Sequence, residues 1–209
     1  MDESVRLSAS DILGDRPFTH PDRTVDDLRA IHSMLSRLRG LVTEVPALPA
    51  EPRPLVVNWP DDSGRQHRVV ICDDRRLRVE PALTLVGFFA TKRLGLDDSP
   101  LTTTDDELIL EFPLHPGILS YSSLEFPDGN WANLIVVHPP EAKDHWRTSE
   151  KHAYAVQELA PTYYAVVRLH NLRLPGGLRA GGDPILLRTK YYDFQGAEPW
   201  RAERELATP

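Results

Sequence analysis

Residues 133–170, NLIVVHPPEAKDHWRTSEKHAYAVQELAPTYYAVVRLH, decide the fold. The stretch begins with an apolar β-rich run and continues with Pro139-Pro140, which suits the first turn of a helix because a missing N–H costs nothing there. The predicted helix runs to about Leu159, Pro161 ends it, and a second β-rich run, YYAVVRL, follows. Its predicted inner stripe comprises Ala142, Trp146, Ser149, Ala153, Val156 and Ala160.

The segments around this helix predict an α+β fold. Strands are predicted at 83–92, 117–126, 131–138, 163–169 and 185–194. A capping box, Thr104 to Glu107, predicts a short helix that begins there and stops at Pro113. The order β-α-β-β-α-β is the ferredoxin-like plan, with both helices on one face of an antiparallel sheet. The other face then needs a cover, and a second copy stacked face to face would supply one and make a homodimer.

The chain before residue 82 adds a helix and a hairpin to this plan. Thr24 is a predicted N-cap, and an apolar stripe predicts a helix over about 25–42. The helix packs either on its own domain or on another subunit. Residues 44–54 carry four prolines and predict an extended linker, and two β-rich runs between 55 and 73 predict a hairpin. The predicted division is an N-terminal tail, helix and linker at 1–54, followed by an α/β-barrel domain at 55–209.

Composition excludes several classes of function. The chain has 209 residues, and 24 Lys+Arg against 31 Asp+Glu give a net charge of −7 without a basic block, so nucleic acid is not an expected partner. The single Cys72 rules out an intrachain disulfide and a cysteine-based zinc site. No signal peptide is recognisable, and the longest apolar run, 82–90, is far shorter than the ~20 residues of a membrane span. A cytoplasmic protein is expected.

Trp146, Ser149 and His152 form a W-x-x-S-x-x-H pattern on the predicted helix. With its flanking strands, this pattern resembles the dimeric α/β-barrel superfamily, in particular its antibiotic-biosynthesis monooxygenase branch, over roughly residues 82–172. The resemblance implies a ferredoxin-like dimeric barrel. It is weakly specific for activity, because the superfamily includes oxygenases, cyclases, haem enzymes and members without known chemistry.

His152 has two readings. It is either a general base that reaches a cavity between the helix and the sheet, or a structural histidine bonded to a carbonyl. The haem-degrading branch of the superfamily is similar, but its histidine ten residues after the tryptophan is replaced here by Val156. Haem held by another histidine stays open, since imidazole is a common axial ligand.

Further candidate residues lie on the strands. Tyr121 and Ser122, on 117–126, and Asn133 would orient oxygen atoms of a substrate if that sheet face lines a cavity; otherwise 117–126 is an edge strand partly in water. Arg168 shares a face with His170, and points either outward or into the barrel.

Three functions compete. The first is a cofactor-independent monooxygenase- or cyclase-type enzyme for a small aromatic or polyketide-like substrate, with His152 as catalytic base. The second is a haem-binding protein that uses the same cavity, and the third is a non-catalytic dimer that binds a protein. The predicted binding residues are Trp146, Ser149, Tyr121, Ser122 and Asn133. No metal is expected, and the cofactor is either none or haem.

Overall fold

The computed structural model describes residues 4–44, 54–60, 64–97 and 99–206. These residues form one open sheet in the order β1-β9-β8-β7-β4-β6-β5-β3-β2, in which β1 runs parallel to β9 and every other neighbouring pair is antiparallel. The strands are β1 Val5–Leu7, β2 Leu55–Pro60, β3 Gln66–Ile71, β4 Ala82–Lys92, β5 Ile118–Glu125, β6 Trp131–Val137, β7 Tyr164–Pro175, β8 Ile185–Asp193 and β9 Trp200–Glu205. The α+β class and the predicted strand-and-helix order between 82 and 175 are confirmed.

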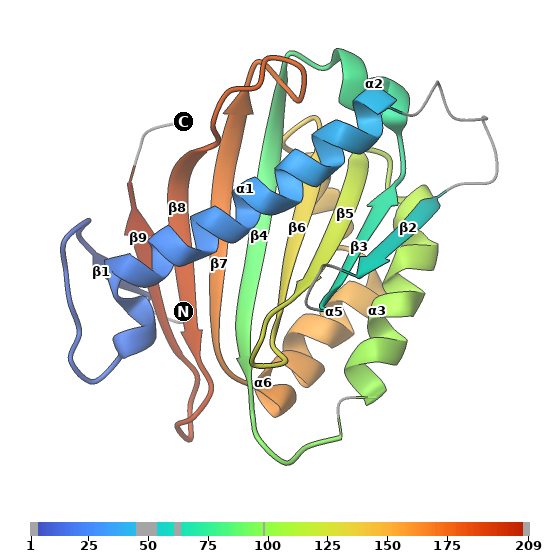
Figure 1. The fold of residues 1–209 in the computed structure, drawn as a ribbon. Coiled ribbons are helices and arrows are strands. Elements are labelled where there is room, and N and C mark those ends of the chain that lie inside the picture. Colours follow the sequence, from blue (N-terminus) through green and yellow to red (C-terminus); the bar gives the residue numbers. More distant parts are fainter. Residues whose placement is uncertain (1–3, 45–53, 61–63, 98, 207–209) are drawn as a thin grey trace.

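Helices lie on both faces of the sheet (Figure 1). The long helix α1 crosses one face, which we call the α1 face, and α3, α5 and α6 lie on the opposite face, which we call the groove face. The helices are η1 Pro17–Thr19, α1 Pro21–Glu44, α2 Asp74–Val79, α3 Ser99–Glu111, η2 Phe112–Leu114, α4 Ala142–Trp146, α5 Glu150–Tyr154, the π-helical η3 Ala155–Leu159 and α6 Ala160–Tyr163.

The apolar stripe predicted for the first helix is confirmed, and it packs on its own chain. Ile31, Leu35 and Leu38 are fully buried in one core with β3, β4, β5, β6 and β7. Full burial of each such side chain stabilises the fold by ~1.5–3 kcal/mol. Gly87 on β4 allows this approach, because a Cβ built there would lie 2.9 Å from Cδ1 of Ile31. The helix begins at Pro21, four residues before the predicted start.

The homodimer prediction rested on an uncovered sheet face. In the structure, α1 covers that face, and its side chains share a core with the central strands (Figure 1). The sheet is also open, with β1 and β2 at its edges. The sheet therefore does not need a second, stacked copy to cover this face. The dimeric barrel stays a prediction.

Two helix predictions need correction. Helix α3 begins at Ser99, so Thr104 lies inside it and does not cap it. The single helix predicted to Leu159 is divided, because Ser149 has an extended backbone and its Oγ accepts from the N–H of His152, which caps a new helix, α5. Helical structure also continues past Pro161 to Tyr163, after the π-helical turn.

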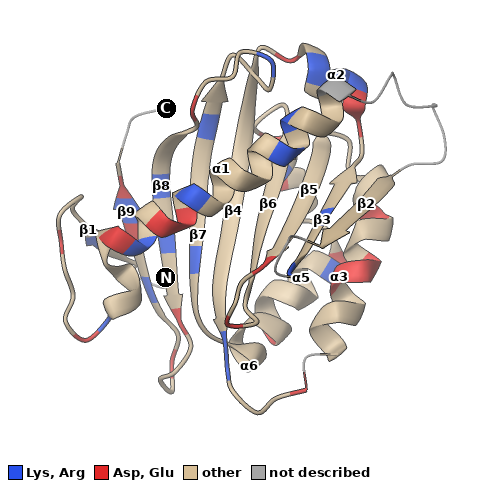
Figure 2. Ribbon diagram, in the orientation of Figure 1, with Lys and Arg blue, Asp and Glu red and all other residues tan. Residues whose placement is uncertain are grey.

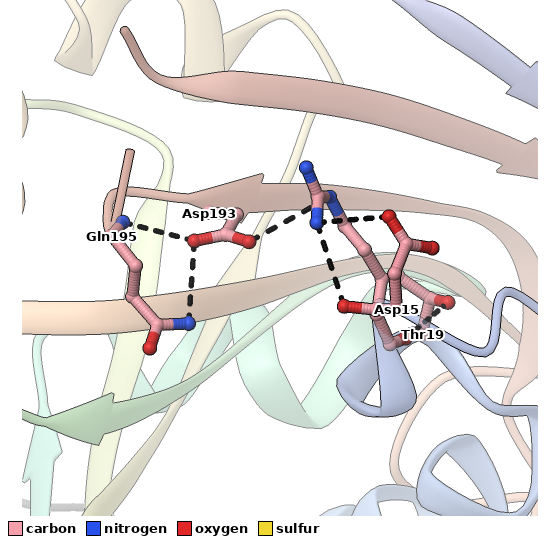
Figure 3. Close-up of polar contacts among 5 residues, drawn as sticks. Asp15, Thr19, Asp193 and Gln195 are labelled. Atoms are coloured by element: carbon pink, nitrogen blue, oxygen red, sulfur yellow. Dashed lines mark hydrogen bonds and ion pairs between the residues drawn. The ribbon is translucent and has the colours of Figure 1, made fainter. Parts of the chain in front are cut away.

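The chain ends add elements that the sequence did not predict. Strand β1 pairs with β9, and the loop after β1 is attached to both β8 and β9. Figure 3 shows Asp193, the last residue of β8, between Gln195 on one side and Asp15 on the other; Arg16 carries an ion pair to each of the two aspartates. The buried Arg204 of β9 donates from Nη1 to the carbonyl of Ala9 and from Nη2 to the carbonyls of Asp11 and Thr19, whereas its buried Nε has no hydrogen-bond partner among the described residues.

Arg168 lies on the α1 face and points neither into a barrel nor into open water. Its Nε and Nη2 donate to the carboxylate of Asp27 on α1, at 2.6 and 2.8 Å. The buried His170 lies between that carboxylate, 2.8 Å from Nε2, and Thr189 Oγ1, 2.8 Å from Nδ1. This network joins α1 to β7 and β8, and it holds the pKa of Asp27 below its usual range because the hydrogen bonds and charges of Arg168 and His170 outweigh its burial.

The predicted hairpin is confirmed as β2 and β3. Most of the predicted proline-rich linker, residues 45–53, lies outside the described residues. In the part of the chain that is described, no helix is both long and apolar enough to cross a bilayer.

Candidate functional site

A groove of about 810 Å³ lies between the groove face of the sheet and helices α3 to α6. Its floor comes from β4, β6, β7 and β8, and its walls come from α3 and from the divided helix α4–α6. Seven aromatic side chains line it: Phe88, Phe112, Tyr121, Trp146, Tyr164, Tyr192 and Phe194. Between them lie aliphatic groups of the central strands, which are Val86, Ile135, Val137, Val167 and Leu169. This lining is typical of a small-molecule site, in which a few polar groups orient an apolar ligand.

Four of the predicted site residues line this groove. They are Trp146 and His152 from the divided helix, and Tyr121 and Asn133 from adjacent strands. Trp146, which the sequence placed on the inner, buried stripe of the helix, is only partly buried, because its ring forms part of the groove wall. The structure therefore brings together residues up to 31 positions apart in the sequence.

The other two predicted residues do not reach the groove. Ser122 is buried on the α1 face, opposite Val69 in the register. Strand β5 lies between β6 and β3, so it is not the edge strand considered above. Ser149 has a structural role: it caps α5, and its Oγ donates to Glu111 Oε2 of α3 at 2.7 Å.

His152 packs against Trp146, with ring centroids 4.4 Å apart and the planes tilted by 40°. Burial lowers the pKa of His152 to about 4, and the positive charges of Arg147 and His115 lower it as well. The imidazole is therefore neutral at pH 7 and presents one donor and one acceptor nitrogen. A base with so low a pKa is weak for proton abstraction at neutral pH, so this environment suits a hydrogen-bonding role better than general-base catalysis.

The titration of His152 can be measured directly. In an NMR titration of the imidazole resonances, assigned with the His152→Gln variant, we expect the His152 signals to stay unchanged from pH 8 to about pH 5.5. Because the pKa is lower in the folded chain than in the unfolded chain, His152 destabilises the fold progressively as pH falls below about 6.5. A titration midpoint between 6 and 7 would show instead that the ring is hydrated.

Tyr121 closes one end of the groove through a charged cluster. Its hydroxyl donates to Asp105 Oδ1 at 2.5 Å, and Asp105 also pairs with Arg68 of β3. Burial raises the pKa of Tyr121 well above its ordinary value, and the charge of Asp105 and the bond to it raise it further. Tyr121 is thus a fixed donor to Asp105. Asp105 is bound from both sides, by Tyr121 and by Arg68.

A pair of histidines, His115 and His145, lies beside the groove wall. Nδ1 of His115 lies 3.4 Å from Nδ1 of His145, and Nε2 of His115 lies 4.0 Å from Glu111 Oε2. Burial and the proximity of His145 lower the pKa of His115. Among the described residues, no group of three or more His, Cys, Asp or Glu side chains has the arrangement of a metal site.

Sequence reasoning missed the side of the groove formed by β7 and β8. Tyr164, Tyr192 and Phe194 line it, and the rings of Tyr192 and Phe194 stack at 6.2 Å with an interplanar angle of 14°. Their i, i+2 spacing in KYYDF placed Tyr192 and Phe194 on one face. Without the knowledge that β8 follows β7 in the sheet, that face could not be assigned to the groove.

Comparison with known proteins gives no relative for this chain. No family model, curated protein or solved structure matches it.

Proposed function

We propose that this chain binds a small, largely aromatic molecule in the groove between α4–α6 and the sheet. The observation that supports the proposal is the groove itself, about 810 Å³ with seven aromatic side chains around its lining. Asn133 and Asn171 project from the floor and His152 from the wall, so polar groups from both sides meet the space. Aromatic rings favour stacked or edge-on contacts with a planar ligand.

The enzymatic form of this proposal is a monooxygenase- or cyclase-type reaction on that ligand. In this form, neutral His152 accepts a hydrogen bond from a substrate hydroxyl, and Asn133 holds a substrate carbonyl. Because the pKa of His152 is about 4, substrates with an acidic phenol or enol suit it better than substrates with a weakly acidic C–H.

Trp146 provides the direct test of binding. We expect the uncharged fluorophore N-phenyl-1-naphthylamine to bind the wild type with enhanced fluorescence, and Trp146→Ala to weaken that binding about tenfold because a stacking surface is lost. Trp146 contacts Phe112 at 5.7 Å and His152 at 4.4 Å between ring centroids, so the wall is continuous at this point.

The matched control is Trp59→Leu, which removes a tryptophan packed against the core of the α1 face. Its affinity for the fluorophore should equal that of the wild type under conditions where both variants are folded by circular dichroism. Equal affinities in the wild type and Trp146→Ala would count against the groove as the binding site.

The haem-binding alternative uses the same space. His152 is the histidine that lines the groove among the described residues, so it is the axial ligand in that reading. Titration with haemin separates the two: a Soret band that shifts on binding and is lost in His152→Ala supports haem, whereas no saturable shift supports the aromatic ligand alone.

A further inference from the structure

One end of the groove carries clustered positive charge. Lys143 lies on α4, Arg147 is the C-cap residue of that helix, and Lys190 projects from β8; all three line the groove. In Figure 2, Lys and Arg fall on β7, β8 and β9, whereas the central β4 and β6 are almost without charge. Of the strand cations, Lys190 of β8 and Arg201 of β9 line the groove, whereas Arg168 of β7 lies on the α1 face, so the cations of the groove lie at its β8 side.

Acidic partners only partly balance this cluster. Glu203 on β9 is shared between Arg188, at 3.1 Å, and Lys190, at 3.9 Å, and Asp144 pairs with Arg147 at 2.9 Å. In the described part of the chain, Lys143 has no carboxylate within ion-pair distance. Among the described residues, Glu203 and Asp144 are thus the carboxylates that form ion pairs with Arg188, Lys190 and Arg147.

The other three cations act on Lys190. The pKa of Lys190 is lowered first by burial and next by the charge of Arg188; Arg147 and Lys143 also lower it, against an opposing effect of Glu203. A group in this state gains from an added anion, which relieves the repulsion and supplies a charged hydrogen-bond acceptor. At the other end, Asp105 is already bound by Arg68 and Tyr121, so the groove is polarised along its length.

We propose that the ligand of this groove is an aromatic molecule with one anionic group, a carboxylate or its equivalent, which Lys190, Lys143 and Arg147 bind at the β8 end. This inference rests on the proposed function, since it assigns a charge to the ligand of the same site. The aromatic body lies against Trp146 and Tyr192, and the anion sets its direction.

Two fluorescent probes with the same aromatic skeleton test the inference. 8-Anilinonaphthalene-1-sulfonate carries a sulfonate, and N-phenyl-1-naphthylamine is its uncharged counterpart. We expect Lys190→Met to weaken binding of the sulfonate about tenfold, the size of one charge-assisted hydrogen bond, and to leave the uncharged probe unaffected. Raising the salt concentration should weaken only the sulfonate.

Lys151→Met is the matched control, because Lys151 pairs with Glu107 outside the groove and its loss removes the same charge. It should leave both affinities unchanged. If Lys190→Met is unstable, the double variant Lys143→Met/Arg147→Met tests the same cluster from the half-exposed helix α4 and should weaken the sulfonate selectively.

The outcomes separate the two proposals. Loss of sulfonate binding alone in Lys190→Met supports the anion end. Equal responses of the two probes, or a sulfonate affinity that Lys190→Met leaves unchanged, overturn the anion end while the aromatic groove stands. If neither probe is weakened by Trp146→Ala, the groove is not the binding site and the proposed function fails first.

Discussion

Replacing Asp27 with Ala is expected to lower the free energy of unfolding by about 3–5 kcal/mol. The Asp27 side chain is 5% exposed and is the shared acceptor of Arg168 and His170, which are 13% and 0% exposed. Its removal leaves a buried guanidinium and a buried imidazole nitrogen without their partner, and the same change detaches α1 from β7. Urea unfolding at pH 7 measures the loss.

The neighbouring Asp26 gives the matched control. It is 60% exposed and pairs with the exposed Arg29, so Asp26→Ala should cost less than about 1 kcal/mol. Equal costs for the two variants would show that the network under α1 is hydrated. Because the pKa of Asp27 is lowered on folding, its contribution is present above about pH 4 and is lost as pH falls through the folded value. The difference between wild type and Asp27→Ala should therefore shrink below pH 4.

Gly177→Ala is expected to cost about 3 kcal/mol or more in unfolding free energy. Gly177 has a φ of +64°, and a Cβ built on it would lie 2.1 Å from the carbonyl oxygen of Glu80. Backbone atoms on both sides prevent the contact from relaxing by a side-chain rotation. The loop after β7 would have to leave the end of α2.

Gly181→Ala separates strain from collision in this experiment. Gly181 has nearly the same φ, +67°, but nothing lies within 4 Å of a Cβ built there. Only the conformational cost of about 1–2 kcal/mol is expected. Thermal unfolding of both variants gives the comparison, and matching losses would mean that the Glu80 carbonyl moves freely away from residue 177.

Most helices and strands could be predicted because each depends on the residue pattern within its own short stretch of sequence. The stripe Ile31, Leu35, Leu38 needed only helical periodicity, and the hairpin β2–β3 needed two β-rich runs around a turn. Strand β9 was missed because its sequence, WRAERE, carries four charges, and only the structure shows that one of them, Arg204, is buried. The break at Ser149 was missed because a serine on an apolar stripe looks the same whether it continues a helix or caps the next one.

The site was predicted in part for the same reason. Trp146 and His152 lie six residues apart, so one helix places both beside the sheet. Lys190 and the aromatic residues of β8 reach the groove only because β8 lies next to β7, and Asp27 meets Arg168 across 141 residues of sequence. Sheet neighbours and long-range ion pairs have no signature in a single sequence.

Alternate residues of strand β7 face opposite sides of the sheet and have different roles. Val167, Leu169 and Asn171 line the groove, while Arg168 and His170 between them hold α1. Ligand contacts and the attachment of α1 thus depend on two separate, alternating sets of positions in one strand. Substitutions at the odd positions change the lining of the groove and so its ligand specificity. Substitutions at the even positions are limited because those residues hold α1. Evolution can therefore change the ligand of the groove through these positions of β7 while the contacts between β7 and α1 are kept. A mutational library confined to the odd positions should likewise alter binding without loss of the fold.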